Sequence, residues 1–365
     1  MKKLIKQGIE TLVPYPPGKP IEELEREMGI TGSIKLASNE NPLGPSPMAV
    51  QAMMEKMKTL NRYPDGSGFY LKAKLSTKFG LPPGQIIIGN GSNELIELTI
   101  RTFLSLDEEV IQPFPTFLVY GKIVTGGGGK MVSIPLSNFG IDLEAIRAAI
   151  TPKTKVIFIN NPNNPTGSAL SKDEMASFLN SIPQDIVVVL DEAYIEFVSD
   201  SRVAQGLDLL ADYPLMVVLR TFSKLYGLAG LRIGYGFASE QIIDYMNRVR
   251  QPFNANALAQ VAATAALDDT EFVSRTLEII RNGLSYLHSQ LNDLGLEYLP
   301  TQTNFFLIKV PGGAKKTYEL MLKEGVIIRA MDSYGLDDYI RVNVGLPEEN
   351  ERFIQTLKKV LNRKF

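Results

Sequence analysis

The sequence contains no cysteine and a single histidine, His288. Without cysteine the chain can form neither disulfides nor thiolate metal sites. One histidine is also too few for a histidine-rich metal site, and it lies in a segment with a helical hydrophobic pattern, which argues against a Ser–His–Asp triad. We expect His288 to be a surface or packing residue and the protein to bind no metal. Any chemistry must therefore rest on lysine, aspartate, tyrosine, arginine or a bound cofactor.

Blocks of like charge and long apolar runs are also missing. The formal net charge is −2, so we expect no nucleic acid and no anionic membrane surface as a partner. No stretch approaches the ~18–20 apolar residues of a membrane span. The apolar run near the N-terminus is too short and interrupted for a signal peptide. These features predict a cytoplasmic protein.

The length and the strand pattern predict two domains. At 365 residues the chain exceeds the ~250–300 residues at which single cores stop growing. In its middle, runs such as KVIFIN, DIVVVL and LMVVL are apolar throughout, which is typical of strands covered on both faces, and they alternate with helical segments. We predict an α/β fold: a large domain with a mostly parallel, helix-covered sheet over residues 45–250, and a smaller α+β domain over residues 251–365. An N-terminal arm and helix over residues 1–44 is expected to complete the smaller domain.

Polar residues follow three successive strands of the predicted sheet. They are Asn164, then Asp191 with Tyr194, then Thr221 with Ser223 and Lys224. Each has an ordinary alternative, since NNPTG is a good turn sequence, an aspartate can cap the next helix, and a lysine after a strand is usually solvated. Ligands bind outside the carboxyl ends of parallel strands, so the three groups are expected to meet in one crevice.

Six motifs carry a resemblance to a known family. LASNENPLGPSP, RYPDG, GNGSNELIE, NPNNPTG, DEAYIEF and TFSKLYGLAGLRIGY occur in this order. Over nearly its whole length the chain resembles the fold-type I (class-II) pyridoxal-phosphate-dependent aminotransferases, and within them the histidinol-phosphate aminotransferase subfamily. The resemblance implies pyridoxal 5'-phosphate as cofactor.

The resemblance also implies roles for the residues at the strand ends. Lys224 would be the amine that forms an imine with the cofactor aldehyde and later moves the proton of the substrate Cα. Asp191 would pair with the pyridine nitrogen of the cofactor and keep it protonated. Asn164 and Tyr194 would hydrogen-bond the ring oxygen O3'.

Further matches concern the phosphate and the faces of the cofactor. Donors to the phosphate would be the Gly-rich turn that opens a helix, together with hydroxyl and guanidinium groups: Gly91, Ser92, Asn93, Thr221, Ser223 and Arg232. The turn by itself is weak evidence. Phe117 matches an aromatic position that stacks on the pyridine, although a core role is an open alternative. Tyr63 matches a tyrosine that reaches the cofactor of a neighbouring subunit, which implies a homodimer with shared sites.

Substrate contacts are implied mainly in the smaller domain. Arg341 matches the arginine that clamps the substrate α-carboxylate. Arg329 matches a position that contacts the substrate phosphate, and Tyr15 is expected to complete that anion pocket; a surface ion pair is an equally open role for Arg329. Asn39 would line the site from an N-terminal loop.

Together these matches predict an aminotransferase of histidine biosynthesis. It would interconvert histidinol phosphate and 2-oxoglutarate with imidazole-acetol phosphate and glutamate. Two alternatives on the same scaffold are an aromatic amino acid aminotransferase and, less favoured, a phosphothreonine decarboxylase. A non-enzymatic regulator is disfavoured, because only about 45 residues precede the large domain and they show no basic helix-turn-helix pattern.

Overall fold

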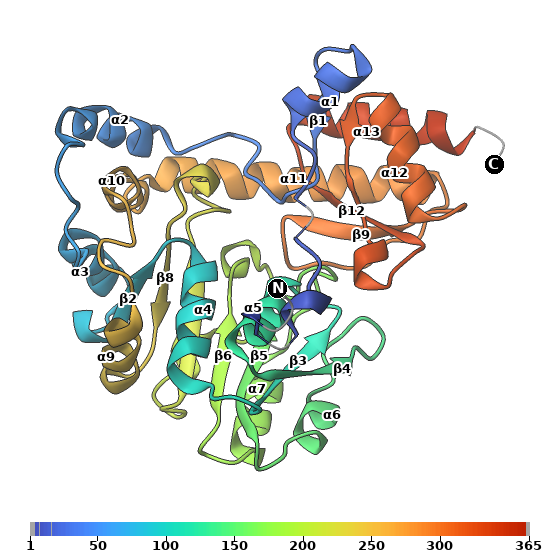
Figure 1. Cartoon of the computed structure of the whole chain (residues 1–365). Coiled ribbons are helices and arrows are strands. Elements are labelled where there is room, and N and C mark those ends of the chain that lie inside the picture. The colour runs from blue at the N-terminus through green and yellow to red at the C-terminus, as the bar shows by residue number, and fades with distance from the viewer. Residues whose placement is uncertain (1–3, 7, 16, 363–365) are drawn as a thin grey trace.

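The computed structural model describes residues 4–6, 8–15 and 17–362 and is built around a seven-stranded sheet (Figure 1). In the order β2-β8-β7-β6-β5-β3-β4, its strands are Ile86–Gly89, Gly234–Phe237, Met216–Thr221, Val187–Asp191, Thr154–Asn160, Glu109–Phe114 and Lys130–Pro135. Strands β3 to β7 pair in parallel, whereas β8 runs antiparallel to both β7 and β2. The predicted mostly parallel sheet of an α/β protein is confirmed.

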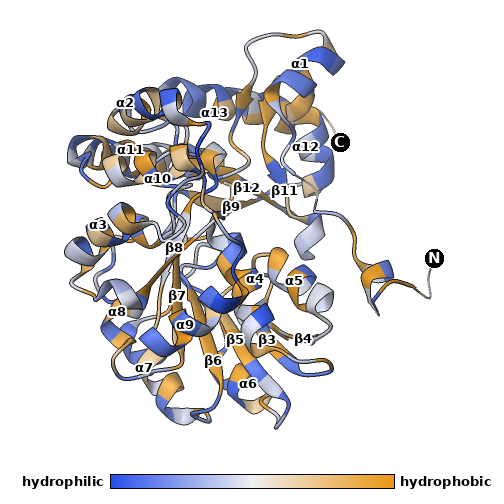
Figure 2. Cartoon of the chain, turned by 60° about the vertical axis from the view of Figure 1, so that its left-hand side comes forward, coloured by the Kyte–Doolittle hydropathy of each residue, from blue (hydrophilic) through white to orange (hydrophobic). Residues whose placement is uncertain are grey.

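Both faces of this sheet are covered by helices, which explains why its strands are apolar throughout. In β5, Ile157 and Ile159 contribute to one core while Val156 and Phe158 contribute to the other. Successive residues of a strand point to opposite faces, so a doubly covered strand must be apolar at every position. Figure 2 shows these central strands in the hydrophobic colour between the helical layers. The surrounding helices are α2 (Pro47–Lys56), α3 (Phe69–Phe79), α4 (Ser92–Phe103), α5 (Val119–Gly127), α6 (Leu143–Ala148), α7 (Lys172–Ser181), α8 (Gly206–Leu209), α9 (Glu240–Val249) and α10 (Ala257–Ala266).

A second core forms around a smaller antiparallel sheet. Its strands, in the order β11-β12-β9, are Arg329–Ala330, Tyr339–Asn343 and Phe305–Lys309. The N-terminal strand β1 (Ile34–Lys35) pairs in parallel with β10 (Val326–Ile327), so the N-terminal segment belongs to this part of the molecule. Helices α1 (Ile21–Met28), α12 (Ala314–Lys323) and α13 (Pro347–Leu361) complete it, and short 3-10 turns occur at Ile9–Thr11, Met57–Thr59, Pro83–Gln85, Ile195–Phe197, Ala229–Leu231 and Asp332–Tyr334.

Helix α11 (Thr270–Asp293) runs from the first core into the second (Figure 1). Val273 and Leu277 pack against the large-sheet core, whereas Leu287 and Leu291 are buried in the core of the smaller sheet. The preceding helix α10 packs entirely with the large-sheet core. The domain boundary at residue 250 stays a prediction, and this packing favours a boundary within α11.

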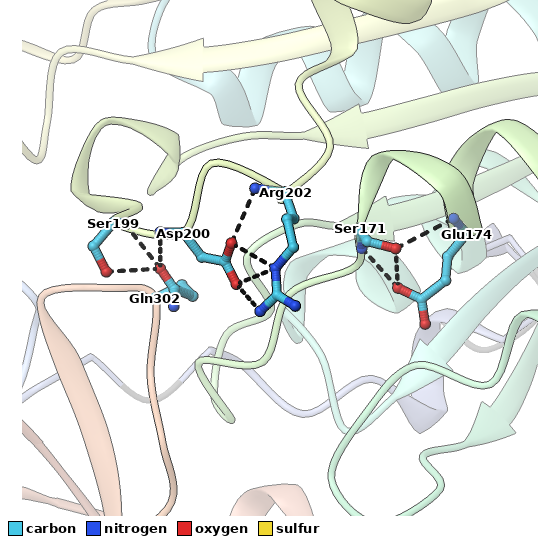
Figure 3. A network of polar contacts seen from close by, with 6 residues as sticks. All are labelled: Ser171, Glu174, Ser199, Asp200, Arg202 and Gln302. Carbon is cyan, nitrogen blue, oxygen red and sulfur yellow. Dashed lines mark hydrogen bonds and ion pairs between the residues drawn. The ribbon is translucent and has the colours of Figure 1, made fainter.

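The loop before β9 is tied to loops of the large sheet. The side-chain oxygen of Gln302 accepts hydrogen bonds from the backbone N–H groups of Ser199 (2.9 Å) and Asp200 (3.3 Å), as Figure 3 shows. The backbone N–H of Gln302 donates to the carbonyl of Gly167 at 2.9 Å. Beside it, Asp200 pairs with Arg202 at the surface. These contacts hold the smaller sheet against the edge where the parallel strands end.

In the described part of the chain, no helix combines the length and apolarity needed to cross a bilayer.

Candidate active site

The polar ends of β5, β6 and β7 meet at one cavity of about 260 Å³. Strand order places these three strands side by side, and their carboxyl ends lie at the same edge of the sheet. The predicted convergence is therefore present in the fold. The cavity is lined by Ser38, Glu40, Ser92, Asn93, Phe117, Asn160, Asn164, Asp191, Ala193, Tyr194, Thr221, Ser223, Lys224, Ala229 and Arg232.

Lys224 follows β7 and extends its amine into this cavity. Its Nζ donates a hydrogen bond to the carbonyl of Ser38 at 3.0 Å and lies 5.7 Å from the centre of the Tyr194 ring. Burial lowers the pKa of Lys224 from 10.5 to about 8, and the positive charge of Arg341 acts in the same direction. A much larger fraction of this amine is therefore neutral near pH 7 than for an exposed lysine.

Asp191 ends β6 and is 3% exposed. The Tyr120 hydroxyl donates to its Oδ2 at 2.6 Å, and the Ala193 backbone N–H donates to its Oδ1 at 3.2 Å. Burial raises the pKa of Asp191 to about 6, and the Tyr120 hydrogen bond opposes that rise. The carboxylate is thus mostly ionised at neutral pH despite its burial, which suits a partner for a cationic ring nitrogen.

Asn164 connects the large sheet to the smaller one through Arg341. Its backbone N–H donates to Asn160 Oδ1 at 2.8 Å, which positions the turn after β5. Arg341, buried in β12, donates from Nη1 to Asn164 Oδ1 at 2.5 Å and from Nη2 to the carbonyl of Ala37 at 2.8 Å. A guanidinium is therefore held directly behind the cavity wall.

Tyr194 and Asn39 form a second link between the sheets. Asn39 Nδ2 donates to the Tyr194 hydroxyl at 2.9 Å, and the Asn39 backbone N–H donates to Asn343 Oδ1 at 3.0 Å. Burial raises the pKa of Tyr194, so its hydroxyl keeps its proton. Asn39 is 1% exposed and has a φ of 55°, whereas its neighbours Ser38 and Glu40 line the cavity. Asn39 thus lies behind the wall and orients Tyr194.

The other end of the cavity is rich in hydrogen-bond donors. Ser92 and Asn93 begin α4, whose first N–H groups have no partner within the helix. Gly91 has a φ of 75°, and a Cβ there would lie 2.6 Å from Arg232 Nη2. Glycine is therefore required for the guanidinium to lie against this helix start. Thr221 and Ser223 line the same region, so the arrangement is suited to an anion such as a phosphate.

The family model for class I and II aminotransferases matches residues 31–357. The chain belongs to this family. The aminotransferase is 48% identical over 359 residues to histidinol-phosphate aminotransferase 1 of Nitrosococcus oceani, covering 98% of this chain and 97% of the relative. It is 47% identical over 358 residues to histidinol-phosphate aminotransferase 2 of Pasteurella multocida, covering 98% of both chains. These relatives place it among the histidinol-phosphate aminotransferases.

A solved structure agrees with this placement. The histidinol-phosphate aminotransferase of Sinorhizobium meliloti, in complex with pyridoxal 5'-phosphate, superposes with a TM-score of 0.88 at 28% identity. The match covers 97% of this chain and 96% of that one. The predicted family, fold and cofactor class are confirmed.

The cavity of the aminotransferase fits pyridoxal 5'-phosphate. It presents a half-buried amine of lowered pKa in Lys224, a buried carboxylate in Asp191 and a helix start suited to an anion beside Arg232. These are complementary to the aldehyde, the ring nitrogen and the phosphate of the cofactor. Among the described residues, no group of three or more histidine, aspartate or glutamate side chains is placed to hold a metal ion. The roles of the individual residues stay predictions.

Arg341 and Asn39 lie behind the wall of this cavity, and three further predicted residues lie away from it. Tyr63 is 82% exposed and stacks on Phe253 with ring centres 4.6 Å apart. Arg329 lies 5.9 Å from the ring centre of Tyr15, so the predicted pair is brought together, but Arg329 lines a separate hollow whose wall includes Lys19. Tyr15 is 43% exposed. Neither member of the pair lines the main cavity in the described structure.

Sequence reasoning missed four residues at or behind the cavity wall. Asn160 ends β5 and follows the same strand-end rule that identified Asp191. Ser38 and Glu40 flank Asn39 in the motif that was already singled out. Tyr120 lies one helical turn after Phe117, and only its packing in three dimensions reveals its contact with Asp191.

Proposed function

We propose that this aminotransferase interconverts histidinol phosphate and 2-oxoglutarate with imidazole-acetol phosphate and glutamate. The observation that carries the chemistry is the cavity that Lys224 and Asp191 share, because it combines an amine of lowered pKa with a buried carboxylate. The choice of substrates is supported by relatives of nearly the same length that carry the name histidinol-phosphate aminotransferase.

Lys224 performs the proton transfer. When bound, pyridoxal 5'-phosphate supplies an electron-accepting ring that stabilises negative charge at the substrate Cα. Because burial lowers the pKa of Lys224 to about 8, its neutral amine accepts the proton from the substrate Cα and releases it again close to neutral pH. The Ser38 carbonyl accepts a hydrogen bond from Nζ and orients the amine.

Asp191, Asn164 and Tyr194 hold the cofactor ring in this proposal. Asp191 keeps a proton on the ring nitrogen, since an ionised carboxylate in a buried site favours a cationic partner. Asn164 and the protonated hydroxyl of Tyr194 line the cavity and donate to the ring oxygen. Phe117 covers one face of the ring and excludes water from it. The phosphate is bound by the first turn of α4 with Thr221, Ser223 and Arg232.

Two arginines serve the substrates. Arg341, held between Asn164 and the Ala37 carbonyl, has an Nε without a hydrogen-bond partner in the described structure, and in this proposal it binds the α-carboxylate of glutamate. Arg329 with Tyr15 binds the phosphate of histidinol phosphate, which has no α-carboxylate. Arg329 is paired in register with Arg341, which lies behind the cavity wall, so in this proposal the Arg329–Tyr15 pair meets only the distal end of a substrate.

Tyr63 supports a homodimer with shared sites. The same stretch of the chain exposes other large apolar side chains, namely Met57 (59%), Phe69 (64%) and Tyr70 (76%), and exposed apolar side chains of this kind are typical of interfaces. Tyr63 then reaches the phosphate in the partner's site. Mixing the Lys224→Ala and Tyr63→Ala variants tests this, because a mixed dimer has one complete site and regains activity that neither variant has alone. A cytoplasmic location stays a prediction.

A half-reaction panel on the purified holoenzyme tests the substrate. Conversion of the cofactor to its amine form is followed by absorbance with histidinol phosphate, glutamate, phenylalanine, tyrosine and phosphothreonine. We expect fast conversion with histidinol phosphate and glutamate, and none in Lys224→Ala. A strong preference for phenylalanine indicates an aromatic aminotransferase, and release of CO2 from phosphothreonine indicates a decarboxylase; either result overturns the substrate assignment.

A further inference from the structure

Tyr120 is a fully buried tyrosine in α5 that none of the roles above employs. Its ring stacks on Phe158, with centres 4.5 Å apart and planes 2° apart, and it meets Phe117 edge-on at 5.5 Å. These contacts fix the direction of its hydroxyl, which points at Asp191 Oδ2 from 2.6 Å. Burial and the negative charge of Asp191 raise the pKa of Tyr120 well above its ordinary value, so the hydroxyl remains a donor.

We propose that Tyr120 is a positioning residue that holds the Asp191 carboxylate ionised and correctly turned toward the cofactor ring nitrogen. The proposal rests on the assignment of Asp191 to that nitrogen. Tyr120 acts only through Asp191 and touches no reacting atom.

The hydrogen-bonding capacity of Asp191 supports this role. An ionised carboxylate has about four lone-pair positions, and in the described structure Tyr120 and the Ala193 N–H each occupy one. Acceptor positions therefore remain for a ring N–H. Because Tyr120 holds Oδ2 from one side, the carboxylate cannot turn freely about its Cβ–Cγ bond in search of other donors.

The charge state of Asp191 depends on the same hydroxyl. Burial disfavours the ionised form, as does the charge of Glu192 on the same chain segment, whereas a donor to the ionised form stabilises it. The other titratable groups around it are Tyr194 after β6 and, in the cavity wall, Glu40, Lys224 and Arg232. Of the side chains around Asp191, Tyr120 is the one that forms a hydrogen bond with its carboxylate in the described structure.

The Tyr120→Phe variant removes the hydroxyl and keeps the ring packing. Binding of pyridoxal 5'-phosphate to the apoenzyme is titrated from pH 5.5 to 8.5 and expressed as the ratio of wild-type to variant affinity, which cancels the titration of the cofactor itself. We expect the pH below which cofactor affinity falls to be about one unit higher in the variant than in the wild type, because the variant has lost a hydrogen bond to a charged group. The affinity ratio should then be roughly tenfold at pH 5.5 and shrink toward one at pH 8.5.

Two control variants make the result specific. Tyr213→Phe removes another buried hydroxyl, which donates to the Ile186 carbonyl at 2.8 Å away from the cavity, and should leave affinity unchanged at every pH. Asp191→Asn should weaken binding strongly, and adding Tyr120→Phe to it should have no further effect. The proposal is overturned if the ratio of wild-type to Tyr120→Phe cofactor affinity does not change with pH. It is also overturned if Tyr120→Phe weakens cofactor binding as much in the Asp191→Asn background as in the wild type. If Asp191→Asn itself binds normally, the assignment of Asp191 fails and the proposal falls with it.

Discussion

Replacing Arg220 with methionine should destabilise the protein strongly, because Arg220 forms a buried ion pair. Its Nε lies 2.8 Å from Glu192 Oε2, and the two side chains are 6% and 0% exposed. Glu192 Oε1 also accepts from the backbone N–H of Gly206 at 2.6 Å, and the guanidinium lies over the rings of Phe79 and Phe237. Methionine fills a similar space without the charge, so the change in stability of the variant reports the loss of the positive charge and not the loss of side-chain volume.

The expected loss is about 3–5 kcal/mol of unfolding free energy, because the partner carboxylate remains buried without compensation. The pH dependence of this loss follows from the Glu192 carboxylate. Burial raises the pKa of Glu192 and Arg220 opposes the rise, so removing Arg220 raises it further. The native state then binds a proton that the unfolded state releases above about pH 4.3. The stability of the variant relative to wild type should therefore fall as the pH increases from 5 toward 8.

Urea unfolding of the apoenzymes followed by far-UV circular dichroism measures this effect, which suits a chain without tryptophan. Arg202→Met is the matched control: its pair with Asp200 is at the surface, and we expect no measurable change. Adding Glu192→Gln to Arg220→Met should recover part of the stability by removing the unpaired charge. A small loss in Arg220→Met that is the same at pH 5 and pH 8 would refute the reasoning.

Three further predictions concern the cavity and the loop after β7. The rate at which the apoenzyme combines with pyridoxal 5'-phosphate should rise with pH through about 8, the pKa of Lys224, because only the neutral amine attacks the aldehyde; stopped-flow absorbance measures it. Gly91→Ala should weaken cofactor binding roughly tenfold or more by displacing Arg232 from the phosphate end, measured by equilibrium titration. Gly227→Ala should cost about 1–3 kcal/mol in urea unfolding, since its φ is 69° and its Cβ would strike backbone, whereas Gly230→Ala, with open space around it, should be neutral or slightly stabilising.

Contradictory outcomes are simple to recognise. A rate midpoint near 10.5 would show that Lys224 is not desolvated in solution. Normal cofactor affinity in Gly91→Ala would mean that Arg232 does not bind the phosphate. Equal effects of the two alanine substitutions at residues 227 and 230 would show that the loop adjusts without strain.

The sequence was sufficient to predict the sheet and the convergence of three strand ends. Runs that are apolar at every position predict strands covered on both faces, and parallel strands bring Asp191 and Thr221 to one edge. His288, expected to be a surface or packing residue, is a packing residue, since its ring stacks on Tyr298 with ring centres 4.3 Å apart. These features depend on local pattern and topology, which a sequence expresses directly.

Contacts between segments that are distant in the sequence could not be predicted from the sequence pattern. Arg341 and Asn164 are 177 residues apart, and their hydrogen bond depends on how the smaller sheet docks on the larger one. The antiparallel pairing of β8 with both β7 and β2 was likewise not predicted, because the sequence of a short apolar strand does not indicate whether it pairs in parallel or antiparallel. Tyr120 reaches Asp191 only through the rotation of α5 on the sheet.

Helix α11 limits how the two cores can move relative to each other. It is continuous over 24 residues: Val273 and Leu277 near its start pack in one core, and the apolar residues from Ile280 onward pack in the other. At this connection there is no loop to serve as a hinge, so a displacement of the smaller sheet must bend the helix and strain its hydrogen bonds. Motions that admit or release substrates should therefore be small at this side of the molecule and larger at the N-terminal connection, and amides in the middle of α11 should exchange with solvent only when packing in both cores is lost.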